Sequence, residues 1–341
     1  MLRKISIVGA GSWGTALAIL AARNGCQTLI WGHNLAHMET LRQDRQNNRY
    51  LPGLLFPKNL LSTSDLSEVG AFSNLILVCV PSHAFKDTLI KLKPYLAKDA
   101  KIAWATKGFN PANGALLHEI VAEIFSTHTP AAILSGPTFA REVAAELPTA
   151  VTIASSQSDF ANQLACMLHS ERFRAYTSSD IIGVEVGGAV KNVLAIAAGI
   201  ADGLGFGANT RAALITRGLS EILRLGIKLG GKQETFMGLS GLGDLILTCT
   251  DNQSRNRRYG LALGQGKNKA TALQEIYQEI EGISAAKETW MLAQKYSLEM
   301  PIIEQTYRVL YEDLAPLIAV KNLLARDQKS EHQPEQTSGN L

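Results

Sequence analysis

Cysteine is scarce in this chain, and the few cysteines stand far apart. The 341 residues contain four of them: Cys26, Cys79, Cys166 and Cys249. No two form a C-x-x-C pair, so reduced thiols explain them better than a disulfide framework or a metal site. His118, His128 and His169 also lack metal-ligand spacing. We therefore expect a cytoplasmic protein without a bound metal, in which these histidines are surface or packing residues.

The chain also lacks an excess of charge and an uninterrupted apolar run. Its formal net charge is +3, which is too small to indicate nucleic-acid binding by bulk electrostatics. Beyond the N-terminal segment, no stretch of transmembrane length is free of glycine or charge, so we expect no stable membrane insertion. Residues 327–341 are polar and poor in apolar side chains, which predicts a disordered tail.

A tight glycine triplet follows the first apolar stretch of the chain. Residues 5–14 read I-S-I-V-G-A-G-S-W-G, and Gly9, Gly11 and Gly14 have the G-x-G-x-x-G spacing of a dinucleotide-binding turn. Gly9 permits the sharp turn from strand to helix, Gly11 lets the backbone approach the phosphates, and Gly14 lets the helix pack closely on the strand. The free N–H groups at the start of that helix would bind the pyrophosphate.

The surroundings of the triplet favour this interpretation over a secretory signal. The uncharged residues 15–22 predict the helix, Gly25 stands where a helix C-cap belongs, and residues 27–31 predict the next strand. Arg3 and Lys4 before an uncharged run also fit a signal peptide. However, three glycines interrupt its apolar core and no convincing cleavage site follows, so we predict a nucleotide-binding turn.

An acidic residue is missing from the end of the predicted second strand. NAD-binding sheets of this kind usually hold the ribose 2′-hydroxyl with an Asp or Glu there, whereas residues 31–34 read W-G-H-N. A carboxylate would repel the 2′-phosphate of NADP, and His33 could accept it. Arg42, Arg45 and Arg49 have helical spacing and could share one face nearby, although each alone is better explained as a solvated charge. The missing acid favours NADPH, with NADH as the other candidate.

Strand-like and helix-like segments alternate up to about residue 180. Helical patterns cover residues 84–96 and 114–126, and several predicted strands are nearly continuous apolar runs, as expected of parallel strands covered on both faces. The predicted strands are residues 4–8, 27–31, 75–80, 101–105, 131–134, 149–154 and 173–176. This alternation predicts a Rossmann-like, doubly wound α/β domain.

The strand signal fades after Asp180, and long helical stretches rich in alanine, leucine and glycine replace it. They cover residues 181–200, 210–229 and 283–296. A chain of this length accommodates two domains. We predict an NAD(P)-binding domain at 1–180 and an all-α substrate and catalytic domain at 181–326, with the active site in the cleft between them. The sequence does not determine the oligomeric state, and a homodimer is one arrangement that it allows.

Loops at the ends of predicted strands point to that cleft, because ligands of open α/β sheets bind outside the carboxyl ends of the strands. The loops are residues 80–82, 106–108 and 135–140. Lys107 is placed to meet an anionic group, although a lone lysine is more often a solvated charge. Gly136 could present a backbone N–H to an oxyanion, although with Pro137 it also forms an ordinary turn.

A lysine and a carboxylate are candidates for chemistry in the helical part. Lys191 stands in the small and apolar residues 184–199. Because burial lowers the pKa of a lysine toward the physiological range, Lys191 could give a proton to a carbonyl oxygen, or take one from a hydroxyl, while a hydride moves at carbon. The alternative is a lysine that reaches water from a helix edge. Asp244, on a glycine-rich turn, could partner Lys191 or bind a substrate hydroxyl, with helix capping as its alternative.

A cluster of hydrogen-bond donors follows that turn. Ser254, Arg255 and Asn256 combine hydroxyl, guanidinium and amide groups, a mixture that suits a phosphate. Arg257 and Arg258 are equally explained as a solvated face. The cluster favours a phosphorylated substrate.

Seven motifs of the chain are highly specific in combination. They are G-A-G-S-W-G at 9–14, W-G-H at 31–33, A-T-K-G at 105–108, S-G-P-T-F-A at 135–140, G-G-A-V-K-N at 187–192, G-L-G-D-L at 241–245 and S-R-N at 254–256. With these motifs the chain resembles the bacterial NAD(P)-dependent glycerol-3-phosphate dehydrogenases from residue 1 to about 325. The resemblance implies reversible reduction of dihydroxyacetone phosphate to sn-glycerol 3-phosphate with NADPH or NADH, which feeds glycerophospholipid synthesis.

The resemblance also implies roles for individual residues, with Lys191 as the proton donor and acceptor. The implied substrate contacts are Lys107, Gly136, Thr138, Lys191, Asp244, Ser254, Arg255 and Asn256. The implied contacts around the nicotinamide dinucleotide, beside the three glycines, are Ser12, Trp13, His33, Lys107, Ala140, Arg255, Glu279 and Glu281. Glu279 departs from the small apolar residue that is common at its position in the family, which matters little if the contact is made by backbone.

Two other functions fit part of the sequence. A related hydroxyacid dehydrogenase would use the same helix lysine on a carboxylate substrate, and chemistry alone does not exclude a carboxylate at the donor cluster of residues 254–256. A non-catalytic dinucleotide sensor would signal redox state through its helical part. The combination of Lys191 with a polar substrate shell disfavours the sensor.

Overall fold

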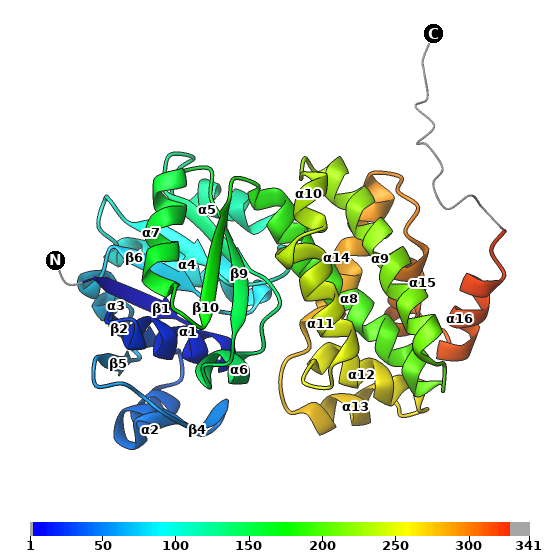
Figure 1. Ribbon diagram of the computed structural model, residues 1–341, viewed down its shortest axis with the longest axis horizontal. Helices are drawn as coiled ribbons and strands as arrows, with labels where there is room; N and C mark the ends of the chain where they lie inside the picture. The colour runs from blue at the N-terminus through cyan, green and yellow to red at the C-terminus, as the bar shows by residue number, and fades with distance from the viewer. Residues whose placement is uncertain (1–2, 328–341) are drawn as a thin grey trace, which may run out of the picture.

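The computed structural model describes residues 3–327, in which a sheet half (residues 4–178) is followed by a helical half (residues 181–324) (Figure 1). Apart from Asp327, the predicted disordered tail lies outside the described residues. One eight-stranded sheet has the order β10-β9-β8-β7-β6-β1-β2-β5. Its strands are β1 (Lys4–Val8), β2 (Gln27–Trp31), β5 (Leu60–Thr63), β6 (Leu75–Val78), β7 (Lys101–Trp104), β8 (Ala131–Ser135), β9 (Thr149–Ala154) and β10 (Phe173–Ser178).

The strand order confirms the predicted Rossmann-like fold. The first six strands of this sheet along the chain, β1, β2, β5, β6, β7 and β8, are parallel neighbours in the order 3-2-1-4-5-6, the arrangement of dinucleotide-binding sheets. Strand β9 runs antiparallel to β8, and β10 runs parallel to β9. The segment between β8 and β9 holds only α6 (Ala140–Ala144), which is too short to form the helical crossover that usually joins parallel strands.

Apolar side chains alternate between the two faces of the sheet. In β6, Leu75 and Leu77 join one core cluster, and Ile76 and Val78 join the other. The first cluster is covered by α1 (Ser12–Arg23) and α7 (Ser158–Leu168). The second is covered by α3 (Leu66–Phe72), α4 (Ser82–Leu92) and α5 (Leu117–Ile124). Helices on both faces explain why the strands read as nearly continuous apolar runs.

All seven predicted strands are present, but the segment between β2 and β6 was not foreseen. It contains α2 (Leu35–Asp44), a hairpin of β3 (Gln46–Asn47) and β4 (Leu51–Leu55), and then the edge strand β5. Helix α2 ends before Arg45, whose φ of 50° is left-handed. The expectation that Arg42, Arg45 and Arg49 share a helix face is therefore wrong. Arg42 lies in α2, whereas the chain leaves the helix at Arg45 and enters the hairpin.

Two predicted helices have different ends from those expected. The helix predicted at 84–96 is α4, which begins at Ser82, ends at Leu92 and is continued by one 3₁₀ turn (Lys93–Tyr95). The helix predicted at 114–126 is α5, which begins only at Leu117. Gly114 has a φ of +71°, so the chain is still turning at that position.

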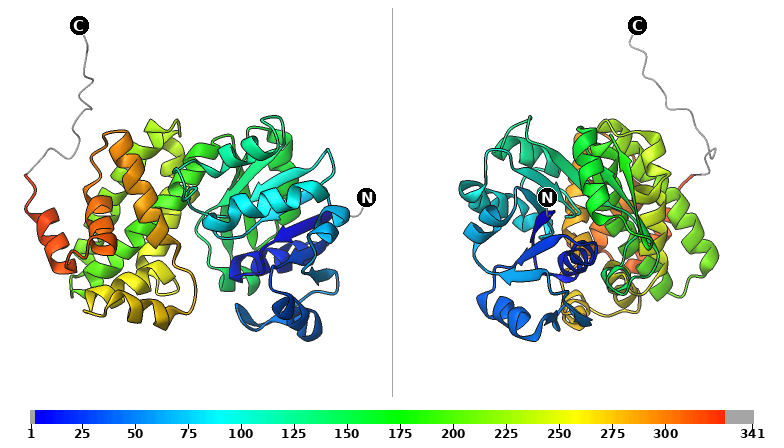
Figure 2. Two further views of the ribbon diagram at one scale, coloured as in Figure 1. Left: turned by 180° about the vertical axis from the view of Figure 1, so that it is seen from behind. Right: turned by 60° about the vertical axis from the view of Figure 1, so that its left-hand side comes forward.

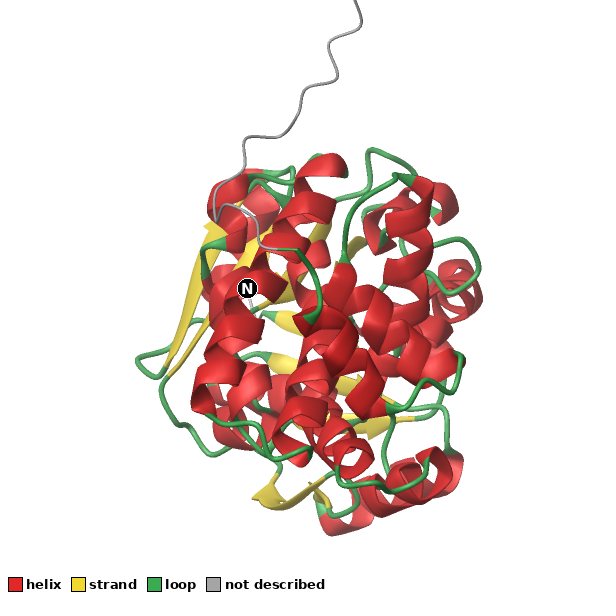
Figure 3. Cartoon of the chain, turned by 90° about the vertical axis from the view of Figure 1, so that its right-hand side faces the viewer, coloured by secondary structure: helices red, strands yellow, loops and turns green. Residues whose placement is uncertain are grey.

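Helix α8 (Ile181–Gly203) runs through the middle of the helical half, among the other helices (Figures 1 and 2). Viewed from the far side of the helical half, helices stand in front of the strands (Figure 3). The others are α9 (Ala208–Lys228), α10 (Gln233–Phe236), α11 (Asp244–Thr250), α12 (Arg255–Gly264), α13 (Lys269–Ile276), α14 (Glu281–Lys295), α15 (Pro301–Tyr311) and α16 (Pro316–Leu324). Within residues 3–327, α8 alone is long and apolar enough to cross a membrane, and 89% of its most apolar window is buried inside the protein.

Helices α8 and α12 approach each other closely because glycines line their contact. A Cβ on Gly199 would lie 2.1 Å from the carbonyl oxygen of Arg257, and one on Gly260 would lie 2.0 Å from that of Ile196. Any larger residue would force the two backbones apart. This contact brings the middle of α8, which carries Lys191, close to the start of α12, which carries the donor cluster.

Candidate active site

The glycine turn has the geometry that a dinucleotide requires. Gly9 has a φ of +125°, and a Cβ on it would lie 2.7 Å from the carbonyl oxygen of Cys79. A Cβ on Gly14 would lie 1.9 Å from the carbonyl oxygen of Gly9, whereas nothing lies within 4 Å of a Cβ on Gly11. The chain is therefore closed around Gly9 and Gly14 and open at Gly11, the N-cap of α1. With no acidic residue in the first turn of α1 and no side-chain cap, its N–H groups suit a pyrophosphate.

The other sheet residues predicted to bind the cofactor surround this turn. Ser12 donates a hydrogen bond to the carbonyl oxygen of Tyr50 in the hairpin, at 2.8 Å. The buried Trp13 Nε1 has no hydrogen-bond partner among the described residues. His33 is exposed after β2, and its neighbour Asn34 caps α2 by accepting a hydrogen bond from the His37 N–H. The end of β2 thus carries an exposed imidazole and an amide in place of a carboxylate.

Lys191 and Lys107 converge on one carboxylate from opposite halves of the molecule. Lys107 follows β7, and its Nζ lies 2.6 Å from Oδ2 of Asp244. Lys191 Nζ, from α8, donates to Oδ1 of the same group and to Thr248 Oγ1 at 2.9 Å. The side chain of Asp244 is fully buried, and that of Lys191 is 6% exposed. The alternative of a Lys191 that reaches water from a helix edge is therefore wrong.

The surroundings of Lys191 tune its proton affinity. Burial lowers the pKa of Lys191 to about 7; the Asp244 carboxylate opposes this change, and the neighbouring Lys107 ammonium adds to it. The amine can therefore exist in either protonation state near neutral pH, as a group that gives and takes a proton must. Asp244 and Thr248 hold the amine in place.

A π-helical turn places Asp244 at this point. Leu239–Gly243 form one π-helical turn, a feature that is frequent at functional sites, and Asp244 is the first residue of α11 directly after it. A Cβ on Gly187 of α8 would lie 2.5 Å from the carbonyl oxygen of Ser240, so the turn lies directly on α8. Gly243 caps α11 without a side chain, and the Asp244 carboxylate binds the two lysines.

The loop after β8 borders the same region. Gly136 has a φ of +150°, and its carbonyl oxygen accepts hydrogen bonds from Thr138 Oγ1 at 3.2 Å and from Lys107 Nζ at 3.5 Å. Pro137 lies 3.7 Å from the Cβ position of Gly243, and Ala140 begins α6. This loop therefore bridges β8 and the turn that carries Asp244.

The donor cluster at the start of α12 is built into the helical half. Ser254 is the N-cap of α12 and accepts a hydrogen bond from the Arg257 N–H at 3.2 Å. Asn256 donates to Asn192 Oδ1 at 3.0 Å and accepts from the Gly282 N–H at 2.9 Å, which joins α12, α8 and α14. Arg255 is partly exposed beside them.

The description of Arg257 as a solvated residue is wrong. Its side chain is 8% exposed, pairs with Asp202 at 2.6 Å and donates to the carbonyl oxygen of Cys249 at 3.1 Å. It points away from solvent because the glycine contact draws α12 onto α8. Arg258 is exposed, as expected.

Glu279 and Glu281 stand at the start of α14. Glu281 Oε2 lies 3.4 Å from Asn192 Nδ2. Glu279 Oε1 lies 2.9 Å from Nδ1 of His83 in the sheet half. Burial raises the pKa of Glu279, and the adjacent His83 charge opposes this rise. Glu279 thus contacts the sheet half, whereas Glu281 contacts α8.

The structure shows polar residues at this site that sequence reasoning did not single out. Thr248 bonds Lys191 and donates to the carbonyl oxygen of Asp244 at 2.7 Å; its position four residues after Asp244 on one helix was the available signal. Asn192 directly follows Lys191. Ser135 Oγ is buried without a hydrogen-bond partner among the described residues, 2.9 Å from the Cβ position of Gly188; its place at the start of the S-G-P-T-F-A motif was the available signal.

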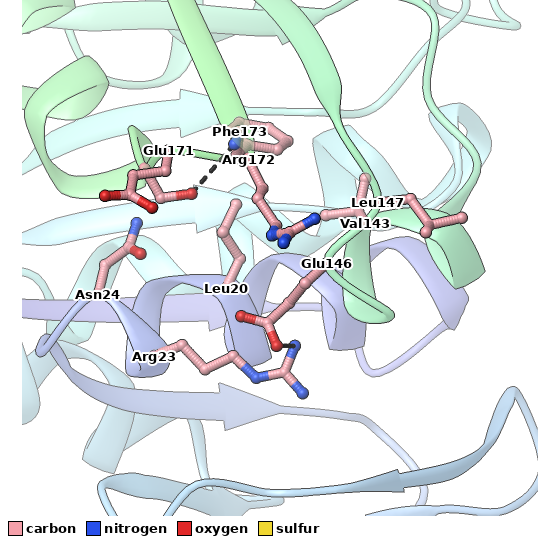
Figure 4. Close-up of a pocket in the computed structure, with 10 residues that line it drawn as sticks. Leu20, Arg23, Asn24, Val143, Glu146, Leu147, Glu171, Arg172 and Phe173 are labelled. Atoms are coloured by element: carbon pink, nitrogen blue, oxygen red, sulfur yellow. Dashed lines mark hydrogen bonds and ion pairs between the residues drawn. The ribbon is translucent and has the colours of Figure 1, made fainter.

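A cavity of about 220 Å³ lies elsewhere in the sheet half (Figure 4). It is lined by the end of α1, the end of α6 and the start of β10, including Arg23, Glu146 and Phe173. This is the amino end of β10, whereas the lysine pair lies at the carboxyl ends of the parallel strands. None of the predicted site residues lines it, so we do not assign the cavity to the active site.

Histidine and cysteine were expected to play no part in metal binding. The four cysteines are free thiols. His118, predicted to be a surface or packing residue, instead pairs with the buried Glu185 of α8, with Nδ1 at 2.5 Å from Oε2. This second His–Glu pair also joins the two halves.

Comparison with known proteins agrees with this geometry. The family model of the NAD-dependent glycerol-3-phosphate dehydrogenase N-terminus matches residues 4–161, and that of the C-terminus matches residues 180–321. The glycerol-3-phosphate dehydrogenase (NAD(P)+) of Colwellia psychrerythraea is 55% identical over 329 residues, which are 96% of this chain and 98% of that protein. The corresponding protein of Vibrio vulnificus is 53% identical over 328 residues, 96% of this chain and 95% of that protein.

A solved structure gives the same result in three dimensions. The crystal structure of glycerol-3-phosphate dehydrogenase from Coxiella burnetii matches with a TM-score of 0.93 at 51% identity, over 95% of this chain and 99% of that one. The chain is an oxidoreductase, so the hypothesis of a non-catalytic sensor is wrong. Both family models match, and a relative is more than 50% identical over nearly the whole length, in agreement with a glycine turn that is open for a dinucleotide. This chain therefore belongs to the NAD-dependent glycerol-3-phosphate dehydrogenase family.

Proposed function

We propose that the protein reduces dihydroxyacetone phosphate to sn-glycerol 3-phosphate with NADPH or NADH, reversibly, and that Lys191 transfers the proton. The observation that carries the proposal is the buried cluster in which Lys107 and Lys191 bind Asp244 at the carboxyl edge of the sheet. The sheet half, proposed as residues 1–180, binds the dinucleotide. The helical half, proposed as residues 181–326, binds the substrate.

The dinucleotide supplies the hydride, and the residues of this chain supply position and protons. The turn at Gly9, Gly11 and Gly14 would hold the pyrophosphate, and His33 would bind near the adenosine ribose. Ser12, Trp13, Lys107, Ala140, Arg255, Glu279 and Glu281 form the rest of the proposed cofactor shell. In reduction, Lys191 in its ammonium form donates a proton to the substrate carbonyl oxygen; in oxidation, the neutral amine accepts the hydroxyl proton.

Asp244 and Thr248 support this step by fixing the Lys191 amine. A carboxylate beside the ammonium also offsets the cost of burying it. Lys107 adds a second positive charge next to the reacting oxygen, where negative charge develops as the hydride arrives. We assign Lys107, Gly136, Thr138, Lys191, Asp244, Ser254, Arg255 and Asn256 to the substrate site.

The substrate phosphate belongs at the start of α12. The Arg255 guanidinium is partly exposed there, beside the N–H groups of a helix N-terminus, and both are suited to an oxyanion. Binding energy from a remote phosphate improves turnover by positioning the carbonyl. The alternative, a related enzyme that acts on a hydroxyacid carboxylate, would use the same groups.

A substrate panel tests the proposal. The absorbance of the reduced nicotinamide is followed with dihydroxyacetone phosphate, unphosphorylated dihydroxyacetone, and several 2-oxo and 3-oxo acids. We expect rapid turnover with dihydroxyacetone phosphate and poor turnover with dihydroxyacetone. Equal efficiency on these two compounds would refute the phosphate role of Arg255, and preference for an oxo acid would favour the hydroxyacid alternative.

The remaining proposals concern cellular context. Free thiols support a place in the cytoplasm. The product is the backbone precursor of glycerophospholipids, so the proposed pathway is glycerophospholipid synthesis. The absent acid after β2 supports NADPH as the favoured cofactor. Analytical ultracentrifugation of the purified chain would measure whether it forms a homodimer.

A further inference from the structure

His83 and Glu279 join the two halves of the molecule at the border of the proposed cofactor site. His83 is the second residue of α4, and Glu279 precedes α14; Nδ1 and Oε1 are 2.9 Å apart. The two side chains are 60% and 39% exposed, so solvent and salt reach the pair. Glu279 is one of the residues assigned to the cofactor shell, whereas His83 has no role in the proposed reaction.

On the sheet side, the pair stands at the end of a segment that forms one wall of the glycine turn. A Cβ on Gly9 would lie 2.7 Å from the carbonyl oxygen of Cys79 and 3.1 Å from the Val80 nitrogen. A Cβ on Gly108 would lie 2.9 Å from Cβ of Ser82. His83 therefore follows a segment that is packed between the pyrophosphate turn and the Lys107 loop.

On the helical side, the pair is tied to the helix that carries Lys191. The Gly282 N–H, three residues after Glu279, donates to Asn256 Oδ1 at 2.9 Å, and Asn256 donates to Asn192 at 3.0 Å. The backbone beside Glu279 is thus fixed to α12 and α8. Burial raises the pKa of Glu279, and the charge of Glu281 raises it further, whereas His83 and Arg255 lower it. Contact with His83 therefore favours the carboxylate form of Glu279, which burial and Glu281 disfavour.

We infer that the His83–Glu279 pair is a clasp that holds the two halves together over the bound dinucleotide and slows its release. The inference rests on the proposed cofactor placement. His83 is a positioning residue here: it acts through the separation of the two halves and leaves the proton transfer unchanged. Its effect belongs in the cofactor dissociation rate and in the KM for cofactor, while the chemical step and the KM for dihydroxyacetone phosphate stay as in the parent.

The test compares His83→Asn, Glu279→Gln and the double variant. NADPH release is measured by stopped flow from the fluorescence of the bound cofactor, and hydride transfer is measured in a single turnover. Because an exposed ion pair contributes little free energy, we expect a roughly two- to fivefold faster release of NADPH in each single variant. The double variant should release NADPH no faster than the singles, because all three lack the same contact. High salt should speed release from the parent by a larger factor than from the variants, because only the parent has the ion pair to lose.

Two further variants make the result decisive. Glu123→Gln removes the exposed ion pair Lys86–Glu123, which joins α4 to α5 within the sheet half, and it should release NADPH at the parent rate. Gly11→Asp places a carboxylate in the open space at the proposed pyrophosphate site and should weaken NADPH binding. Suppose that Gly11→Asp weakens NADPH binding. If the clasp variants then release NADPH at the parent rate, or if the effects of His83→Asn and Glu279→Gln add up in the double variant, the clasp is wrong and the cofactor placement stands. If Gly11→Asp binds NADPH normally, the placement is wrong and the clasp fails with it.

Discussion

The sheet half and the helical half differ in how far apart along the chain their functional residues stand. In the sheet half, one turn of six residues, Gly9 to Gly14, contains all three glycines of the dinucleotide turn, and the strand before it and helix after it complete the site. In the helical half, Lys191 meets Asp244 across 53 positions, and Lys107 reaches the same carboxylate across 137. The proposed cofactor turn is therefore a local structure, whereas the proposed proton-transfer cluster is a product of helix packing.

The difference has a physical cause. Backbone N–H groups and a helix N-terminus can bind phosphates wherever glycine allows the turn, so the binding groups are adjacent in sequence. A tuned amine needs burial and a partner carboxylate, and only distant segments can exclude water from all sides. The junction of the halves adds contacts of its own, including the two His–Glu pairs His83–Glu279 and His118–Glu185.

The largest expected effect lies in the helical half, at Lys191. Lys191→Met keeps much of the length and the apolar stem but removes the ionisable nitrogen. Turnover should fall by roughly 10²–10⁴, the usual contribution of a positioned proton-transfer group, while NADPH binding in the sheet half stays normal. The measurements are steady-state kinetics, NADPH titration and thermal unfolding. Turnover within a few-fold of the parent, in a folded variant, would remove Lys191 from the mechanism and weaken the contrast between the halves.

The pH dependence of the two reaction directions is a second test of Lys191 as the proton-transfer group. Because the pKa of Lys191 is lowered to about 7, the ammonium needed for reduction is lost as pH rises through about 7, and the amine needed for oxidation is gained. The kcat/KM for reduction should therefore fall about tenfold per pH unit above that value, and the kcat/KM for oxidation should fall likewise below it. Rate profiles from pH 5 to 10 measure both limbs. Parallel profiles for the two directions would contradict a single shared group.

The junction of the halves should show a smaller, pH-dependent effect on stability. Burial alone would lower the pKa of His118, but the hydrogen bond and charge of Glu185 outweigh it, so this pKa is raised. Burial also raises the pKa of Glu185, against the same hydrogen bond. The contribution of the His118 charge to stability is then complete below the ordinary histidine pKa of about 6.5 and is lost as pH rises through the raised value.

His118→Asn tests this pair and keeps the backbone N–H that bonds Glu185. It should lower the free energy of unfolding by about 1.5–3 kcal/mol at pH 6, the range for hydrogen bonds to charged groups, and by less at pH 9. Denaturant unfolding at the two pH values gives the difference. His128→Asn, at an exposed histidine of the sheet half, is the control and should change neither value. An equal loss at both pH values would mean that charge plays no part in the junction.

The smallest effect is expected in the sheet half, at the exposed end of β2. His33→Asp introduces the acid that this position lacks, which repels a 2′-phosphate and offers a hydrogen bond to a ribose hydroxyl. The preference should shift toward NADH by about fivefold, equivalent to about 1 kcal/mol at an exposed site. The ratio of kcat/KM for NADPH and NADH measures it. An unchanged ratio would place cofactor selectivity elsewhere, for example on the hairpin after α2.

Much of the sheet half was predictable from the sequence because its signals are local. All seven predicted strands are present, since buried parallel strands read as apolar runs between turns. The hairpin at 46–55 was missed because α2 ends at a non-glycine residue, Arg45, that adopts a left-handed conformation without a sequence marker. The antiparallel pairing of β9 was missed because strand direction depends on the connection between the strands.

By itself, the sequence determined the glycine turn, the alternation of strands and helices, the change to an all-helical second half and the specific set of motifs that marks the family. Tertiary structure alone decided which side chains meet. Lys191 was equally compatible with a helix edge until the glycine contact of α8 with α12 and the π-helical turn before Asp244 enclosed it. The reason is that periodicity and turn chemistry act over a few residues, whereas burial, charge pairing and a shifted pKa arise only when distant segments pack together.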